Sequence, residues 1–205
     1  MAGSEEVNLD LGPLPLVFGG GSIGGLYQPV TDEAAAQTLD EAYPALAELR
    51  AQGTVRAIGA GMNSAAPLAA LVERCDLDCV LVAGRYTLLD RSAEVDLLPL
   101  CLQRGVAVLA GGVFNSGILA DPVPGARYDY APAPPAVLAR ARLMRDACER
   151  YGVPLPAAAL QFTLRHPAVT AAVVGVRAPD EIRADDGYLA AIVPDALLDE
   201  LAGIT

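Results

Sequence analysis

Residues 54–119 decide the fold, and they read TVRAIGAGMNSAAPLAALVERCDLDCVLVAGRYTLLDRSAEVDLLPLCLQRGVAVLAGGVFNSGIL. Short apolar runs alternate here with amphipathic patterns, and each run ends in a turn rich in Gly or Asn. The apolar runs are 55–60, 79–83 and 106–110, and the amphipathic patterns are 65–74 and 94–104. Such runs are typical of buried parallel strands, and the patterns between them predict crossover helices. The stretch therefore predicts a parallel α/β fold.

Polar and glycine residues follow each predicted strand directly. They form the segments 61–63, 84–87 and 111–116. Ligands of parallel α/β proteins bind at the carboxyl ends of the strands. We therefore expect a small-molecule site at this edge, where Asn63, Arg85, Tyr86 and Asn115 would supply the hydrogen bonds of a catalytic pocket.

The composition excludes several classes of protein. The 205 residues are enough for one domain, 1–205, and the net charge of −11 argues against nucleic acid and anionic membranes, which both need a basic face. No apolar run approaches the roughly 20 residues of a membrane span. The first residues are acidic and lack the basic region of a signal peptide, so we expect a cytoplasmic protein.

The residue types that are missing restrict the chemistry. All 14 basic residues are Arg, and the absence of Lys removes Schiff-base chemistry and a P-loop lysine. The four cysteines match no zinc or redox spacing, and the single histidine, His166, is expected to be structural. We therefore expect no metal site.

The remaining segments complete the predicted elements. We expect a loose leader at 1–13, a strand at 14–18, a glycine-rich loop at 19–25 and the last strand at 169–174. A helix is expected at 34–52, capped by Thr31 and kinked or broken at Pro44. Further helices are expected at 136–151, 156–164, 182–191 and 194–202. The proline-rich segment 120–135 is either a lid over the site or a plain surface connection.

Several of these motifs together resemble the aldo-keto reductases, a TIM-barrel family of NAD(P)H-dependent oxidoreductases. The resemblance is carried by VRAIGAGMN at 55–63, GRYTLLD at 84–90, AGGVFNSGIL at 110–119 and VGVRAPDE at 174–181. Within the family the pattern is similar to the bacterial branch of L-fucose and D-threo-aldose dehydrogenases. The implied fold is a parallel-stranded partial TIM barrel of about five βα units.

The chain departs from the family at residues 34–38. In the family, a long segment at this point carries three strands and the Asp, Tyr, Lys and His of the catalytic tetrad. Here the first helix runs directly into the helix that precedes residue 55. The resemblance thus implies that the tetrad is absent and that ordinary carbonyl reduction, in which Tyr donates a proton beside Lys, has no residues to use.

The resemblance also places a cofactor. It implies that Asn63 lies near the nicotinamide, and that a phosphate and adenosine site follows in two later segments. The implied contacts are Gly112, Phe114, Asn115 and Ser116 at the pyrophosphate, and Gly175, Arg177 and Glu181 at the adenosine and its phosphate, with Asp185 where the family usually has Asn. The alternatives are that the glycines serve tight turns and that Arg177 pairs with Asp180 or Glu181. NADP, NAD and no cofactor all stay open.

Two consequences follow for assembly and function. Five strands barely close a barrel, and an open sheet exposes edges, so we expect a homodimer. The favoured function is a non-redox small-molecule enzyme, such as a cyclase, isomerase or dehydratase. The alternatives are an NAD(P)-binding oxidoreductase with residual or altered activity, a non-catalytic binding or scaffold protein, and a chain without function.

Overall fold

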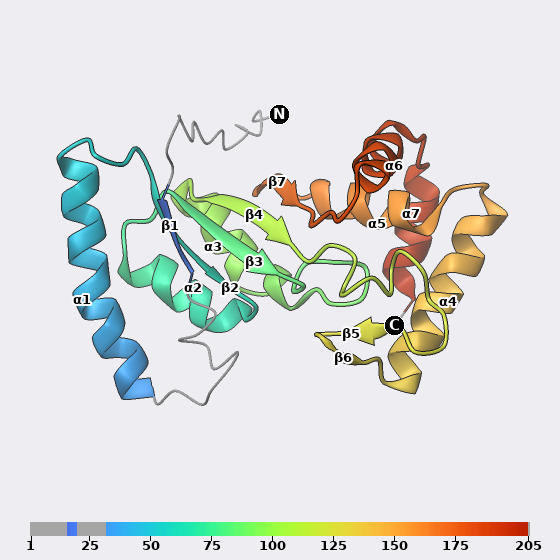
Figure 1. Cartoon of the computed structure of the whole chain (residues 1–205), viewed down its shortest axis with the longest axis horizontal. Helices are drawn as coiled ribbons and strands as arrows, with labels where there is room; N and C mark the ends of the chain where they lie inside the picture. The colour runs from blue at the N-terminus through green and yellow to red at the C-terminus, as the bar shows by residue number, and fades with distance from the viewer. Residues whose placement is uncertain (1–15, 20–31, 205) are drawn as a thin grey trace.

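A computed structural model describes residues 16–19 and 32–204 of the chain (Figure 1). The predicted leader, most of the predicted glycine-rich loop and the predicted cap Thr31 lie outside these residues. Side chains are described from Asp40 onward.

The main sheet is parallel and five-stranded, in the order β1-β2-β3-β4-β7. Its strands are β1 (Leu16–Gly19), β2 (Ile58–Met62), β3 (Cys79–Ala83), β4 (Ala107–Gly111) and β7 (Val169–Val173). Residue Leu16 is in register with Ile58, so β1 lies beside β2 as the predicted crossover requires. Among the described strands, β1 and β7 are the two ends of the sheet, which is therefore open.

In the described residues, seven α-helices and one 3-10 turn lie between the strands or, for the last two helices, after them. They are α1 (Asp32–Ala51), α2 (Ala65–Arg74), η1 (Ser92–Glu94), α3 (Leu97–Arg104), α4 (Pro135–Arg150), α5 (Leu155–Leu164), α6 (Pro179–Ala190) and α7 (Asp195–Gly203). The single helix predicted at 94–104 is wrong in part, because η1 precedes a helix that begins only at Leu97. Pro99 has no amide hydrogen, and this start places it in the first turn, where no hydrogen bond is lost.

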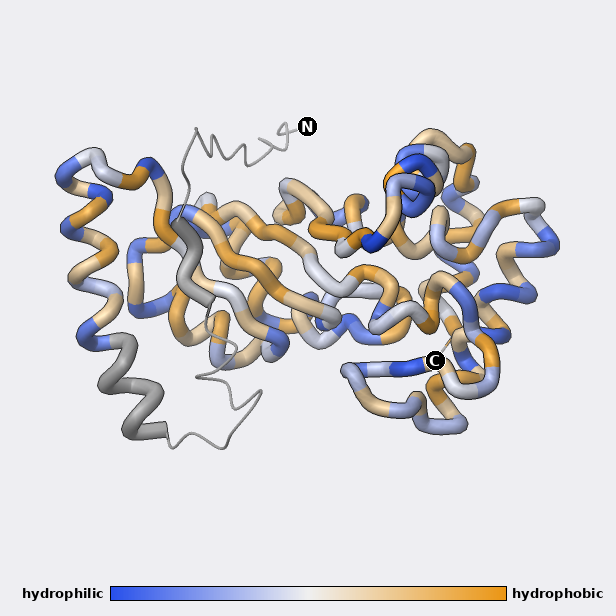
Figure 2. The backbone as a smooth tube through the Cα atoms, in the orientation of Figure 1, coloured by the Kyte–Doolittle hydropathy of each residue, from blue (hydrophilic) through white to orange (hydrophobic). Residues whose placement is uncertain are grey.

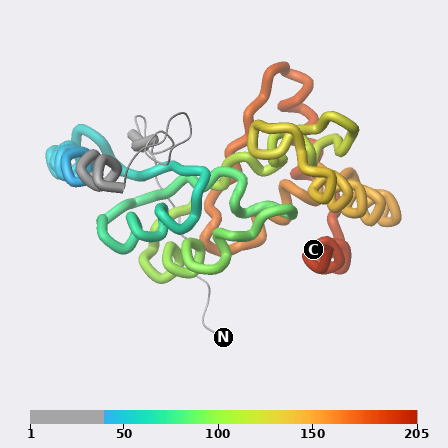
Figure 3. The backbone as a smooth tube through the Cα atoms, turned by 90° about the horizontal axis from the view of Figure 1, so that it is seen from below, coloured from blue at the N-terminus to red at the C-terminus, as the bar shows by residue number. Residues whose placement is uncertain are grey.

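The core lies between the sheet and the helices. Leu68 and Val72 of α2 and Leu97 and Leu98 of α3 are fully buried against strand residues such as Val80. Figure 2 shows the same apolar bands along the strands. Helices α4 and α7 pack together near the C-terminus, at the opposite end of the molecule from α1 (Figure 3).

Helix α1 is held beside the sheet by two side chains. The Tyr43 hydroxyl accepts a hydrogen bond of 3.0 Å from the amide of Asp76, and Arg50 forms ion pairs with Asp76 and Asp78. The predicted break at Pro44 does not occur, since α1 runs unbroken through this exposed proline. The attachment on both sides of Pro44 offsets the cost of its missing hydrogen bond.

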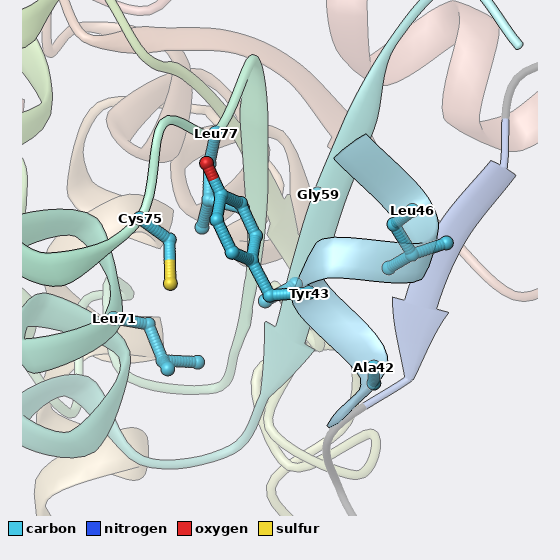
Figure 4. A pocket seen from close by; sticks show the side chains of 8 residues that line it. Ala42, Tyr43, Leu46, Gly59, Leu71, Cys75 and Leu77 are labelled. Atoms are coloured by element: carbon cyan, nitrogen blue, oxygen red, sulfur yellow. The ribbon is translucent and has the colours of Figure 1, made fainter. Parts of the chain in front are cut away.

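A small apolar cavity lies between α1, α2 and β2. Figure 4 shows the Tyr43 ring pointing from α1 toward Leu71, Cys75 and Leu77. Its volume of about 20 Å³ is that of one or two water molecules at most. This cavity is therefore a packing feature rather than a ligand site.

In the part of the chain that the structure describes, no helix is long and apolar enough to cross a membrane. The cytoplasmic location stays a prediction.

Candidate functional site

A cleft of about 840 Å³ opens at the carboxyl ends of β3, β4 and β7. It is the position that the sequence predicts. The residues that line it and enter the argument are Asn63, Gly84, Gly112, Phe114, Asn115, Ser116, Arg127, Asp129, Tyr130, Gly175, Arg177, Glu181 and Asp185. The volume falls within the range of pockets that enclose a small organic ligand.

Strained backbone is concentrated at this cleft. Among the described residues, the non-glycine residues with positive φ are Asn115 (44°), Ser116 (60°), Asp129 (48°) and Tyr130 (63°). All four line the cleft. The left-handed conformation costs Ser116 and Tyr130 about 1–2 kcal/mol each, whereas Asn115 and Asp129 adopt it more readily. Strain of this kind collects at ligand sites.

The segment 120–135 contains a short hairpin that the sequence did not reveal. Strands β5 (Arg127–Tyr128) and β6 (Ala131–Pro132) are antiparallel and are joined by Asp129 and Tyr130. Two positive φ values in a two-residue loop are typical of a type I′ turn, where glycine is usual at the second place. Tyr130 occupies that place instead, and its amide donates a 3.0 Å hydrogen bond to the Ser116 hydroxyl. The hairpin thus lines the cleft, and its role as a lid stays a prediction.

Asn115 presents an unpaired acceptor at the cleft. The residue is 3% exposed, and its Nδ2 donates to the Gly84 carbonyl oxygen at 3.4 Å. Its Oδ1 is buried and has no hydrogen-bond partner. An unmatched buried acceptor costs about 1–3 kcal/mol, which a ligand N–H or O–H would offset.

Two glycines let the ends of β3 and β4 approach each other at the cleft. Gly84 and Gly112 have φ values of 69° and 63°, and a Cβ on Gly112 would lie 3.1 Å from the Gly84 nitrogen. Glycine thus serves the backbone conformation at both positions, and at Gly112 it also allows the close contact.

Arg85 has a structural role beside the cleft. Its guanidinium donates to the Asn63 carbonyl oxygen at 2.7 Å and forms ion pairs with Asp90 at 3.0 Å and Asp129 at 2.8 Å. Burial alone would raise the pKa of Asp90, but hydrogen bonds from Ser92 and the Arg85 charge together lower it. The prediction that Arg85 serves as a catalytic hydrogen-bond donor does not fit, because its nitrogens already have protein partners and it does not line the cleft.

Tyr86 also lies away from the cleft. It is 4% exposed, and its ring packs against Phe162 and His166, with ring centroids 5.5 Å and 5.7 Å apart. Burial raises the pKa of its hydroxyl to about 12, so the group stays protonated at neutral pH. Residues that follow a strand point in different directions, and the turn after β3 directs Tyr86 into the core. Its predicted catalytic role is therefore not supported.

The far side of the cleft carries the residues predicted for adenosine. The Arg177 amide donates to Glu181 at 2.6 Å, and the Arg177 guanidinium donates to the other carboxylate oxygen at 2.9 Å. The hydrogen bond from the Arg177 backbone amide is the largest cause that lowers the pKa of Glu181, and the hydrogen bonds from the Arg177 guanidinium are the second. Asp185 lines the same wall, and burial together with the Glu181 charge raises its pKa. The predicted pairing of Arg177 with Glu181 is confirmed.

The cysteines and the histidine lie outside this site. All four thiols are free, and burial raises the pKa values of Cys79, Cys101 and Cys148 to about 11 or 12. Such thiols are inert core groups. Burial also lowers the pKa of His166.

Residues 28–201 match the model of the aldo/keto reductase family. The chain belongs to this family. The expected resemblance is thus confirmed, and the open parallel sheet is a partial TIM barrel.

Two curated aldo-keto reductase relatives have high sequence identity to the chain. Pyridoxal 4-dehydrogenase from Microbacterium luteolum is 46% identical over 161 residues, which are 78% of this chain and 47% of that protein. D-threo-aldose 1-dehydrogenase from a Pseudomonas species is 40% identical over 166 residues, 80% of this chain and 50% of that protein. The chain spans about half the length of the curated relatives it matches.

Solved aldo-keto reductases share the fold. The holo form of an aldo-keto reductase from Bacillus halodurans superposes with a TM-score of 0.67 at 24% identity, over 82% of this chain and 54% of that one. A glycerol dehydrogenase from Gluconobacter oxydans gives 0.62 at 21% identity, over 81% and 54%. Identities this low support the fold alone.

The cleft gathers the residues that the resemblance assigned to a nicotinamide dinucleotide. Every residue that the resemblance assigned to the cofactor lines it: Asn63, Gly112, Phe114, Asn115, Ser116, Gly175, Arg177 and Glu181. Asn115 itself lines the cleft, and its buried Oδ1 lacks a hydrogen-bond partner. Only two of the four predicted catalytic residues, Asn63 and Asn115, line the same cleft.

Proposed function

We propose that this aldo-keto reductase chain binds a nicotinamide dinucleotide in the cleft and does not catalyse ordinary carbonyl reduction. The observation that carries the proposal is the convergence of strain and an unmatched acceptor. All four positive-φ, non-glycine residues of the described chain line one cleft, and the buried Asn115 Oδ1 there lacks a partner. Strained backbone and unsatisfied polar atoms both reduce stability, and they cluster at sites where a bound ligand can offset their cost.

The roles of the chain's own residues follow from their positions. We assign Asn115 as the acceptor of a ligand hydrogen bond, and the exposed residues Gly112 and Ser116 allow a diphosphate to approach the backbone. Asn63 lies on the β2 side, where the resemblance places the nicotinamide. The dinucleotide, when bound, would supply or accept a hydride.

Reduction of a carbonyl also needs a proton donor. The chain contains no Lys, and we infer that the segment that carries the tetrad in the family has no counterpart at residues 34–38, which lie within the single helix α1. The tyrosine hydroxyl of Tyr86 is buried with a raised pKa, which makes it a poor replacement. We therefore propose binding without the ordinary reaction of the family.

The non-redox enzyme that the sequence favoured is the weaker candidate. That hypothesis assigned hydrogen bonds to Asn63, Arg85, Tyr86 and Asn115, and of these only Asn63 and Asn115 line the cleft. A scaffold role is compatible with dinucleotide binding.

Isothermal titration calorimetry with NADH and NADPH tests the proposal. We expect a dissociation constant in the micromolar range, about −8 kcal/mol, for at least one dinucleotide. The variant Asn115→Gly removes the acceptor, while glycine tolerates the φ of 44°. Its affinity should fall by up to about tenfold, the value of one hydrogen bond.

The matched control is Gln52→Ala, which removes a side-chain amide that does not line the cleft. It should bind like the wild type. Absence of binding heat for both dinucleotides, with circular dichroism showing a folded protein, would refute the proposed function.

A further inference from the structure

The wall of the cleft formed by α6 is acidic. Glu181 and Asp185 are four residues apart on this helix, and both line the cleft, together with a single basic residue, Arg177. The other arginine of the cleft, Arg127, is on the hairpin, where it donates to the Tyr130 carbonyl oxygen at 3.1 Å and 2.5 Å. The α6 wall therefore carries two carboxylates and one guanidinium.

Arg177 is already bound to one of these carboxylates. Its amide, Nε and Nη2 donate to Glu181 at 2.6, 3.2 and 2.9 Å. The Arg177 side chain is 91% exposed, and exposed ion pairs are worth less than about 1 kcal/mol, so pairing alone would not keep the guanidinium from a phosphate. Whether a phosphate is attracted or repelled depends instead on the net charge of the wall. This charge is negative whether or not Arg177 and Glu181 are paired.

The N-terminus of α6 opposes this charge only weakly. A free helix N-terminus attracts anions through its unpaired amides and its dipole. Here Asp180 and Glu181 occupy the first turn and already supply negative charge. A further phosphate at this end meets a dipole that two carboxylates have largely compensated.

We propose that the α6 wall selects an unphosphorylated adenosine ribose, so that the cleft binds NAD(H) in preference to NADP(H). This inference rests on the proposed function. A 2′-phosphate adds a charge of about −1.5 to −2 at pH 7, which the wall repels. The ribose 2′-hydroxyl is neutral and donates a hydrogen bond, and a carboxylate such as Glu181 accepts one.

Calorimetry with NAD⁺ and NADP⁺ on the full chain tests the inference. We expect NAD⁺ to bind at least about tenfold more tightly, a difference of about 1.4 kcal/mol. Glu181→Gln removes one charge and releases Arg177, and it should reduce this ratio at least about fivefold by improving NADP⁺ binding. Arg177→Ala leaves both carboxylates uncompensated and should increase the ratio.

Asp180→Asn is the matched control for Glu181→Gln. It removes the same charge from the neighbouring residue, whose partner is Arg183 and which does not line the cleft. Because Asp180 also lies in the first turn of α6, the ratio should fall slightly, by about twofold, against at least about fivefold for Glu181→Gln. Circular dichroism checks that each variant keeps the helix content of the wild type.

Three outcomes overturn the inference. NADP⁺ affinity equal to or above NAD⁺ affinity overturns the selection itself while leaving dinucleotide binding in place. An equal response of the ratio to Glu181→Gln and Asp180→Asn overturns the role of the α6 wall. Absence of binding for both dinucleotides overturns the proposed function and the inference with it.

Discussion

Replacement of Gly112 by Ala is expected to damage both stability and ligand binding. The φ of Gly112 is 63°, a conformation that costs an L-residue about 1–2 kcal/mol. Alanine also lowers the conformational entropy of the unfolded chain, which stabilises the folded protein by about 0.4–1 kcal/mol. The net backbone effect is thus a destabilisation of about 0 to 1.6 kcal/mol.

Close contact adds to this cost. The new Cβ would lie 3.1 Å from the Gly84 nitrogen, 3.5 Å from the Gly84 Cα and 3.7 Å from the Ala83 carbonyl carbon, all of them backbone atoms that cannot rotate away. Overpacking of this kind costs about 1–3 kcal/mol. We therefore expect Gly112→Ala to lower the free energy of unfolding by about 1–4.6 kcal/mol.

Gly105→Ala is the matched control. Gly105 has nearly the same φ, 67°, but a Cβ there meets no atom within 4 Å, and the residue does not line the cleft. Gly105→Ala should therefore lower the free energy of unfolding only by the cost of the left-handed backbone conformation. Urea unfolding followed by circular dichroism measures both variants, and calorimetry with NADH measures binding, which only Gly112→Ala should weaken. Equal loss of stability in the two variants, or unchanged binding by Gly112→Ala, would refute the assignment of Gly112 to the wall of the cleft.

The remaining predictions concern activity, assembly, pH and strain. The chain should not reduce simple aldehydes or ketones with NADPH, and turnover like that of an ordinary family member in an absorbance assay would contradict this. The open sheet should be shielded in a homodimer, and light scattering that gives a mass near 21 kDa at micromolar concentration would instead favour a monomer. Because its pKa is lowered on folding, Asp90 contributes stability that is complete above its ordinary pKa of about 4 and is lost as the pH falls through the folded value. The stability difference between wild type and Asp90→Asn should therefore shrink in acid, and a difference that does not change with pH would argue against the Arg85 pair. Tyr130→Gly should raise stability by about 1 kcal/mol in urea unfolding while weakening dinucleotide binding; a loss of stability would mean that the turn is not strained.

The sheet was largely predictable because its strands are short apolar runs between turn residues. Strand β3 and helix α2 have the predicted bounds, whereas β2 begins three residues later than predicted, at Ile58. Val55 and Ala57 are buried before the strand begins, so burial and ladder pairing start at different residues. A hydrophobic pattern reports burial, and only the pairing of backbone groups defines the strand.

The location of the cleft was predictable from the sequence, but the set of residues that line it was only partly predictable. Asn63 and Asn115 were identified because they follow strands, and the same rule wrongly included Tyr86, whose turn points it into the core. Asp129 and Tyr130 were missed as ligand-facing residues, although their position between prolines in 120–135 was the available signal. Which way a side chain leaves a turn depends on backbone angles that composition does not encode.

The guanidinium of Arg85 fixes the shape of the cleft in a way that resists salt. It ties the Asn63 carbonyl, the Asp90 carboxylate and the Asp129 carboxylate together from a side chain that is only 17% exposed. Dissolved ions screen such partly buried pairs far less than exposed charges, whereas the exposed Arg177 and Glu181 stay open to screening. Ionic strength can therefore serve as a selective probe here, because added salt alters the charge that an incoming nucleotide meets while the frame that receives it keeps its form.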